Sequence, residues 1–196
     1  MSNRTLTALL LLATFAATAP IALAQTSGVP LAKPQQPIAA EKNPPGDIPD
    51  NQAFVAFKPP LGFSIKVPEG WARRESPGAV SFSDKYNALQ VLVSARPMPP
   101  TLTSLKANEI AALEKSPKAV RVTSVKPLVL PAGPALVAHY SANSDPNPVT
   151  NKAIRLDAAS YYVWKAGKLA TLTVSAPAGA DNADQWLLMA RSFVWQ

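Results

Sequence analysis

Residues 161–175 read Tyr161-Tyr-Val-Trp-Lys-Ala-Gly-Lys-Leu-Ala-Thr-Leu-Thr-Val-Ser175, and this stretch decides the fold class. Two runs rich in β-branched and aromatic residues flank a short polar segment, which is typical of strands around a turn. Gly167 in that segment can adopt the positive φ that a tight hairpin requires. The stretch therefore predicts two antiparallel strands, 161–164 and 169–175.

A turn through Ala166 and Gly167 sorts the hairpin side chains onto two faces, because strand side chains alternate. One face carries Tyr161, Val163, Ala170, Leu172 and Val174, and the other carries Tyr162, Trp164, Leu169, Thr171 and Thr173. Both faces hold large apolar groups. Either helices cover both faces, or one face is open to a partner or ligand.

Working outward from the hairpin, the chain alternates between strand and helix patterns. Period-two or β-branched runs predict further strands at 63–67, 80–82, 89–95, 120–130, 135–141 and 152–159. A helix is expected over 101–115 and another after Asp181. Because hairpins imply antiparallel pairing, the predicted class is α+β, with a mostly antiparallel central sheet and helices on its faces.

Both predicted helices carry start signals and an apolar stripe. Thr101 or Thr103 can cap the first, whose stripe is Leu102, Leu105, Ile110 and Leu113. Asp181 is expected to cap the second, with Asp184 completing a capping box. The apolar face of this closing helix is Trp186, Met189, Ala190 and Phe193.

Residues 1–24 have the three-part pattern of a secretory signal peptide. A basic start ending at Arg4 precedes the apolar run Leu6–Ala19, and Ala22 and Ala24 occupy the positions that a signal peptidase reads. Cleavage is predicted between Ala24 and Gln25, which makes the mature chain periplasmic or secreted. The alternative is an uncleaved anchor, although the run is shorter than the roughly 20 apolar residues that span a bilayer. After cleavage, no transmembrane helix is expected.

Residues 25–52 differ in composition from the rest of the chain. Six prolines, mixed with Ala, Gln, Lys and Asn, leave few large apolar groups to offset ordering entropy. We therefore expect a disordered, Pro-rich tether over 25–52, either a spacer or docking strip or a mature N-terminus without a role, and a globular domain over 53–196.

Composition limits the partners and the chemistry. The chain has no Cys, so it has no disulfide or thiolate chemistry, and its net charge is +7. Export argues against nucleic acid as the partner of this basic chain. A weak attraction to anionic envelope surfaces and binding to another envelope protein remain, beside a merely solvated surface.

The residues that could carry chemistry are few, and each has a structural interpretation. His139 lies inside an apolar strand without a nucleophile elbow nearby, so we expect a partly buried, hydrogen-bonded strand histidine. Asn143-x-Asp145-x-Asn147 begins like a calcium loop but lacks the later Gly and acid, which favours an Asx turn. The pair Asp181 and Asp184 fits capping better than acid–base work. Finally, Arg73 and Arg74, with Lys58 and Lys66, form either a basic patch or a solvated edge. No catalytic, cofactor-binding or metal-binding residue is assigned, and no cofactor is expected.

Several segments together resemble the PsbP/Mog superfamily, over residues 53–196. They include Phe63-Ser-Ile-Lys-Val-Pro-Glu-Gly-Trp71, Ala79-Val-Ser-Phe82, Gly133-Pro-Ala-Leu-Val-Ala-His-Tyr140, Tyr161-Tyr-Val-Trp164 and the closing Ala190-Arg-Ser-Phe193. The resemblance implies an α-β-α sandwich. It also implies a mainly non-enzymatic protein, since members of that group are assembly subunits, chaperones, a Ran-binding factor and envelope proteins, and it carries over no catalytic residues.

The expected function is therefore a non-catalytic protein-binding or assembly module of the periplasm or envelope. The alternative is a carrier or sensor for a small apolar ligand held between sheet and helix. A third hypothesis, an enzyme of unfamiliar design, would need a cleft that brings His139 to a carboxylate and a hydroxyl.

Overall fold

The structure is a computed structural model that describes residues 33–42 and 44–196. The predicted signal peptide and the first part of the predicted tether lie outside the described residues. The described residues, 33–42 and 44–196, form one unit.

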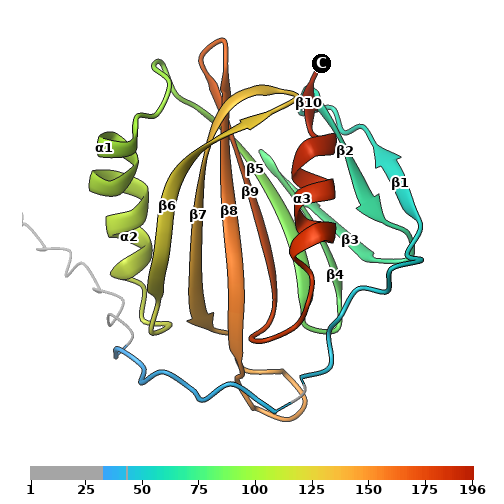
Figure 1. Ribbon diagram of the computed structural model, residues 1–196, viewed down its shortest axis with the longest axis vertical. Coiled ribbons are helices and arrows are strands. Elements are labelled where there is room, and N and C mark those ends of the chain that lie inside the picture. Colours follow the sequence, from blue (N-terminus) through green and yellow to red (C-terminus); the bar gives the residue numbers. More distant parts are fainter. Residues whose placement is uncertain (1–32, 43) are drawn as a thin grey trace, which may run out of the picture. The chain divides into compact units, whose positions relative to one another are not determined.

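A seven-stranded antiparallel sheet forms the centre of the fold (Figure 1). Its spatial order is β3-β4-β5-β9-β8-β7-β6, so β3 and β6 are the edges. The strands are β3 (Ala72–Ser76), β4 (Ala79–Asp84), β5 (Asn87–Ala95), β6 (Arg121–Leu130), β7 (Gly133–Asn143), β8 (Arg155–Lys165) and β9 (Lys168–Pro177). Helices and an antiparallel sheet together give the α+β class that the sequence predicts.

The hairpin that decides the class is confirmed in detail. Strands β8 and β9 pair in the expected register, with Tyr161 opposite Leu172 and Lys165 opposite Lys168. Ala166 and Gly167 have φ values of 47° and 81°, as a two-residue turn matched to strand twist requires. Strand β8 is longer than expected, because it joins the predicted strands 152–159 and 161–164 into one.

One face of the sheet is covered by helix α3 (Ala183–Ser192) and by a small antiparallel sheet. That sheet has the order β1-β2-β10, built from β1 (Phe54–Phe57), β2 (Phe63–Pro68) and β10 (Val194–Trp195). The side chains buried between these layers include Phe63, Ile65, Leu89, Tyr161, Val163, Leu172, Val174, Met189 and Phe193. We call this cluster the large core.

The opposite face is covered by a short helical segment, which consists of α1 (Leu102–Leu105), a π-helical turn η1 (Lys106–Ile110) and α2 (Ala111–Glu114). Its buried cluster, the small core, is Leu105, Ile110, Leu136, Ala138, Tyr162 and Leu169. Helices therefore cover both faces of the hairpin. The π turn brings residues five apart into line, which explains why Leu105 and Ile110 are the two buried members of the predicted stripe.

The start signals are right for one helix and wrong for the other. Thr101 caps α1, and its side chain accepts from the Ser104 backbone N–H at 3.1 Å. Helix α3, however, starts after Asn182 and not after Asp181, and it has no capping box. The Asn182 side chain is buried and used elsewhere, as described next, whereas Asp184 does lie in the first helical turn.

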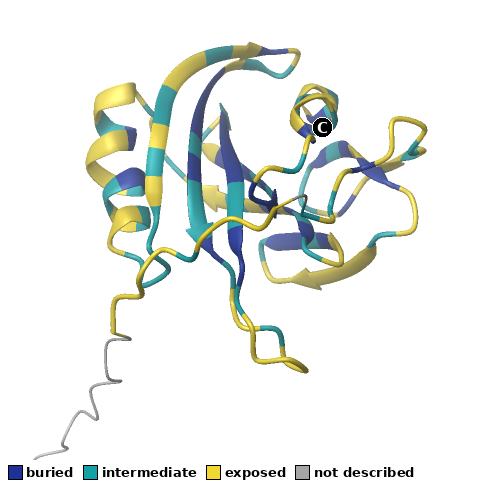
Figure 2. Ribbon diagram, turned by 60° about the horizontal axis from the view of Figure 1, so that its bottom comes forward, coloured by how far each residue is buried: buried dark blue, intermediate teal, exposed yellow. Residues whose placement is uncertain are grey.

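Residues 33–42 and 44–52, which we call the strap, lie along the domain, and Figure 2 shows them crossing the end of the sheet. Ile48 is 4% exposed and belongs to the large core. Asn182 Oδ1 accepts from the Ile48 N–H at 2.6 Å, and its amide donates to Gly46 O at 2.9 Å. This packing departs from the expectation of a tether outside the fold, because one apolar anchor and buried amide partners offset the ordering entropy.

Candidate functional site

The histidine singled out by sequence lies in the middle of β7. His139 is half-buried and pairs with Ser124 on one side and Ala159 on the other. Burial, and then the positive charge of Lys126, lower the pKa of His139. In the described part of the chain, no carboxylate or hydroxyl is hydrogen-bonded to its imidazole; the Thr123 hydroxyl donates instead to the His139 backbone carbonyl at 3.0 Å.

The calcium-like triplet is dispersed. Asn143 is 1% exposed and faces the strap, whereas Asp145 pairs with Lys118 at 2.8 Å. Asn147 Oδ1 accepts from the backbone N–H groups of Val149 and Thr150, which is an Asx-type turn. Within residues 33–42 and 44–196, no group of three acids, histidines or cysteines is arranged to hold a metal ion.

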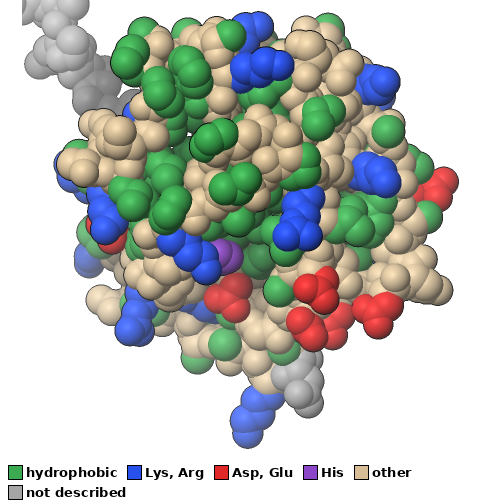
Figure 3. Space-filling view, turned by 45° about the horizontal axis from the view of Figure 1, so that its top comes forward, with side chains coloured by type: hydrophobic (Ala, Val, Ile, Leu, Met, Phe, Trp, Pro, Cys, Tyr) green, Lys and Arg blue, Asp and Glu red, His purple; other side chains and the backbone are tan. Residues whose placement is uncertain are grey.

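The paired arginines do not form one patch. They are neighbours on the exposed edge strand β3, so their side chains point to opposite faces. Arg73 pairs with Glu75 at 3.3 Å and stacks over the Phe57 ring at 5.2 Å. Figure 3 shows Lys and Arg side chains dispersed among hydrophobic groups on the face it presents. Strand β3 is therefore a solvated edge of the sheet and not a basic patch.

The most distinctive surface feature is an apolar groove of about 610 Å³ at the end of the sheet that carries the β8–β9 turn. We call it the proline groove. Four prolines form its walls, from the loop before α1, from β6 and from the start of β7. Its lining is Pro99, Pro100, Pro127, Leu128, Val129, Pro134, Ala135, Leu136, Tyr162, Trp164, Lys165 and Ala166.

The position of Pro127 in the sheet explains why a proline is tolerated in the wall of the groove. Pro127 is tolerated inside β6 because β6 is an edge strand. Val129, on the same strand, is 81% exposed, so the groove opens to solvent. Met98, in the loop that bears Pro99, is 72% exposed and extends the apolar surface beyond the groove.

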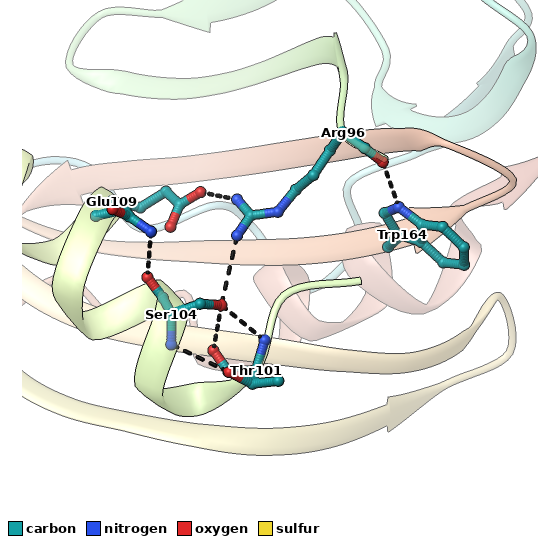
Figure 4. A network of polar contacts seen from close by, with 6 residues as sticks. Arg96, Thr101, Ser104, Glu109 and Trp164 are labelled. Carbon is teal, nitrogen blue, oxygen red and sulfur yellow. Dashed lines mark hydrogen bonds and ion pairs between the residues drawn. The ribbon is translucent and has the colours of Figure 1, made fainter. Parts of the chain in front are cut away.

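A polar network fixes the loop that forms one wall (Figure 4). The Trp164 indole N–H donates to the Arg96 carbonyl at 2.8 Å, which ties the hairpin to the loop. The Arg96 guanidinium pairs with Glu109 on η1 and reaches Ser104 Oγ at 3.5 Å. Because Thr101 and Ser104 cap each other, the loop is held at both ends, and the groove is preorganised.

The electrostatics of the groove favour neutral, apolar contacts. Burial raises the pKa of Tyr162 to about 12, and the nearby Tyr140 and Glu109 add to this effect. Tyr162 is therefore protonated at neutral pH. Of the lining side chains only Lys165 is charged, and none is a carboxylate, imidazole or aliphatic hydroxyl.

Sequence reasoning did not find this groove, because its lining comes from four segments that look like ordinary core and turn residues. The one available signal was the amphipathic second face of the hairpin, which placed Tyr162 and Trp164 together. The segment Pro97-Met-Pro-Pro100 by itself indicates no more than the end of the strand predicted at 89–95.

No protein-family model matches this chain, and no curated protein matches it. Among solved structures, it is similar to cyanobacterial PsbP (CyanoP) from Synechocystis sp. PCC 6803, with a TM-score of 0.51 and 18% identity over 74% of this chain and 94% of that one. The fold is PsbP-like. A protein of unknown function from Pseudomonas aeruginosa, PA94, matches with a TM-score of 0.49 and 9% identity over 73% of this chain and 97% of that one.

The identity with CyanoP is too low for the PsbP-like fold to bring any role with it. Among the described residues, no helix is long and apolar enough to cross a membrane.

Proposed function

We propose that this chain is a non-catalytic binding module of the cell envelope, periplasmic or secreted, that holds an apolar segment of another envelope protein in the proline groove. The observation that carries the proposal is the groove itself: an apolar, solvent-open depression whose wall is fixed by the network of Arg96, Glu109 and Trp164. Its lining is mainly proline, aliphatic and aromatic side chains, with Lys165 as the one charged group, which supports binding of an apolar segment.

The shape of the apolar surface favours a protein partner. Val129 and Met98 lie at the groove and beyond it, and both are largely exposed. A bound segment of chain covers such a rim, whereas a small molecule fills only the depression. Rigid proline and aromatic side chains lose little entropy on binding, which suits a docking surface.

The alternative is a carrier or sensor for a small apolar ligand. Its support is the volume of the groove, about 610 Å³, which falls within the roughly 300–1,000 Å³ of small-molecule sites.

Charge introduced at the rim tests the proposal. Val129→Glu places a carboxylate in the groove mouth, and the matched control Val149→Glu changes another exposed valine, 90% exposed, in a distant loop. In cross-linking from the envelope of the native host, wild type and Val149→Glu should capture the same protein, and Val129→Glu should lose it. Equal capture by all three would contradict the proposed surface.

A second measurement separates the alternative. Binding of the uncharged fluorophore N-phenylnaphthylamine, lost in Val129→Glu and accompanied by no specific protein capture, would replace the protein-binding proposal with the carrier.

The export component has its own test. If residues 1–24 are a signal peptide, intact-mass measurement of secreted material should give a chain that begins at Gln25. A mass that retains residues 1–24 would argue for the uncleaved anchor.

A further inference from the structure

A second cavity, of about 680 Å³, lies under the strap at the opposite end of the sheet. Strap residues Gln35, Pro37 and Ile38 line one side, and the ends of β7 and β8 line the other. It shares no lining residue with the proline groove.

Arg155 is the buried cation of this cavity, at 8% exposure. Its Nη1 donates to Ala119 O at 2.8 Å and to Asn143 Oδ1 at 3.0 Å, and its Nη2 donates to Ser141 Oγ at 2.6 Å. All three acceptors are neutral.

No carboxylate pairs with Arg155 in the described part of the chain, where the ion pairs are Arg73–Glu75, Arg96–Glu109 and Lys118–Asp145. Residues 1–32 contain no Asp or Glu, and residue 43 is Asn, so these positions supply no partner either. Burying a charge without a counter-ion is costly, and a bound anion would remove that cost.

Arg155 also has donors left over. A guanidinium carries five N–H bonds, of which the chain's described residues accept three, so the Nε–H and one N–H on Nη2 remain. Glu109 Oε2 and Trp195 Nε1 are the described polar side-chain atoms that are enclosed without a partner. Arg155 Nε has no partner and is not among these enclosed atoms, and Arg155 lines the cavity. An Nε–H beside a free Nη2–H is the side of a guanidinium that suits a planar carboxylate.

The other residues that line the cavity indicate which kind of anion it could bind. Pro37, Ile38, Ala119, Val120 and Ala178 give the cavity apolar walls, and Arg121 adds a second cation.

Two acids also line the cavity, Asp157 and Glu41, and Asp157 Oδ2 accepts from the Gly179 N–H at 3.0 Å. Two negative charges nearby disfavour a dianion such as phosphate more than a monoanion. The mixture of charge and hydrocarbon fits a carboxylate joined to an apolar body.

We propose that the cavity under the strap binds a small organic monocarboxylate, whose carboxylate pairs with Arg155 and whose apolar body lies against Pro37, Ile38 and Val120. The strap forms part of this site. Asn143 Oδ1 accepts from both Arg155 Nη1 and the Ile38 N–H, and the Asn143 amide donates to Gln36 O at 2.8 Å. Ligand on Arg155 should therefore hold the strap in place.

Calorimetric titration with octanoate tests the proposal, with octanol as the probe that has a similar body and no charge. Octanoate should bind the full mature chain with a Kd of about 1 mM or lower, at least about tenfold more tightly than octanol and than inorganic phosphate. Arg155→Lys keeps the positive charge but loses the planar guanidinium that can donate two parallel hydrogen bonds. It should weaken octanoate binding at least about tenfold. The exposed control Arg191→Lys, on α3, should not change binding.

Limited trypsinolysis of the wild-type chain gives a readout that does not depend on the variant folding. Octanoate should slow cleavage after Lys42 in the strap, and octanol should not. The proposal is overturned if octanoate does not bind, if octanol or phosphate binds equally well, if a folded Arg155→Lys binds as wild type does, or if bound octanoate leaves the strap cleavage rate unchanged.

Discussion

The β8–β9 hairpin contributes side chains to both faces of the seven-stranded sheet, yet the two faces are covered very differently. The large core is closed by α3 and the small sheet, and its aromatic side chains interlock: the Phe63 and Phe193 rings stack at 5.3 Å, and Trp195 meets Phe193 edge-on at 5.3 Å. The small core lies under one short helical segment broken by a π turn, and it ends at the proline groove. We therefore expect the closed face to contribute most of the stability. The thinly covered face leaves an apolar groove open to solvent.

The largest expected effect is on the closed face. Phe193→Ala removes a side chain that is 0% exposed and in contact with two aromatic rings. The lost transfer energy and the cavity should lower the free energy of unfolding by about 3–5 kcal/mol. Urea unfolding measures this loss. A change within about 0.5 kcal/mol, the range of ordinary surface substitutions, would show that Phe193, directly after α3, does not seal this face of the sheet.

The matching change on the thin face is Leu105→Ala. Leu105 is also 0% exposed, but its cluster is small and its helical cover is irregular, so the site can relax around the lost volume. We expect a loss of about 2–3 kcal/mol, the low end for a buried leucine. Urea unfolding beside Phe193→Ala gives the comparison directly. A larger loss than for Phe193→Ala would reverse the ranking of the two faces.

The strap tests how far the large core extends. Ile48→Ala deletes its apolar anchor, which should cost about 2 kcal/mol, because an end segment can close over part of the cavity. The exposed neighbour Val55→Ala, at 43% exposure, serves as control. Thermal unfolding of both variants checks this. If the Ile48→Ala chain is as stable as wild type, the result would support the disordered tether expected for residues 25–52.

The features that could be predicted from the sequence are those that depend on local interactions. The turn at Ala166-Gly167 and the alternation of Tyr161 and Tyr162 are local signals, and they gave the hairpin, its faces and the class. The strap depends on Asn182 and Asn143, which bind segments more than 100 residues away. Composition carries no trace of such pairings, so proline content alone suggested disorder.

The same contrast explains the misplaced start of α3. Asp181 has the right residue type and spacing for a cap, but its backbone N–H donates to Asp47 in the strap at 2.9 Å. Tertiary contacts therefore set the helix start one residue later. The proline groove was missed for a related reason: each of its prolines is explained locally by a turn or an edge strand, and only the fold brings them together.

The smallest expected effect concerns His139. This residue lies on β7, next to edge strand β6. Burial and the nearby Lys126 lower its folded pKa below the usual 6.5, so the unfolded chain binds the proton more readily. The neutral imidazole therefore contributes stability above about pH 6.5, and that contribution is lost as pH falls through the folded pKa. The melting temperature of wild type should fall modestly between about pH 7.5 and pH 5.5, where most carboxylates remain ionised. His139→Gln should fall less over the same range, because glutamine does not titrate. If both proteins lose the same amount, other groups carry the acid sensitivity, and the half-buried position of His139 has no energetic consequence for this face of the sheet.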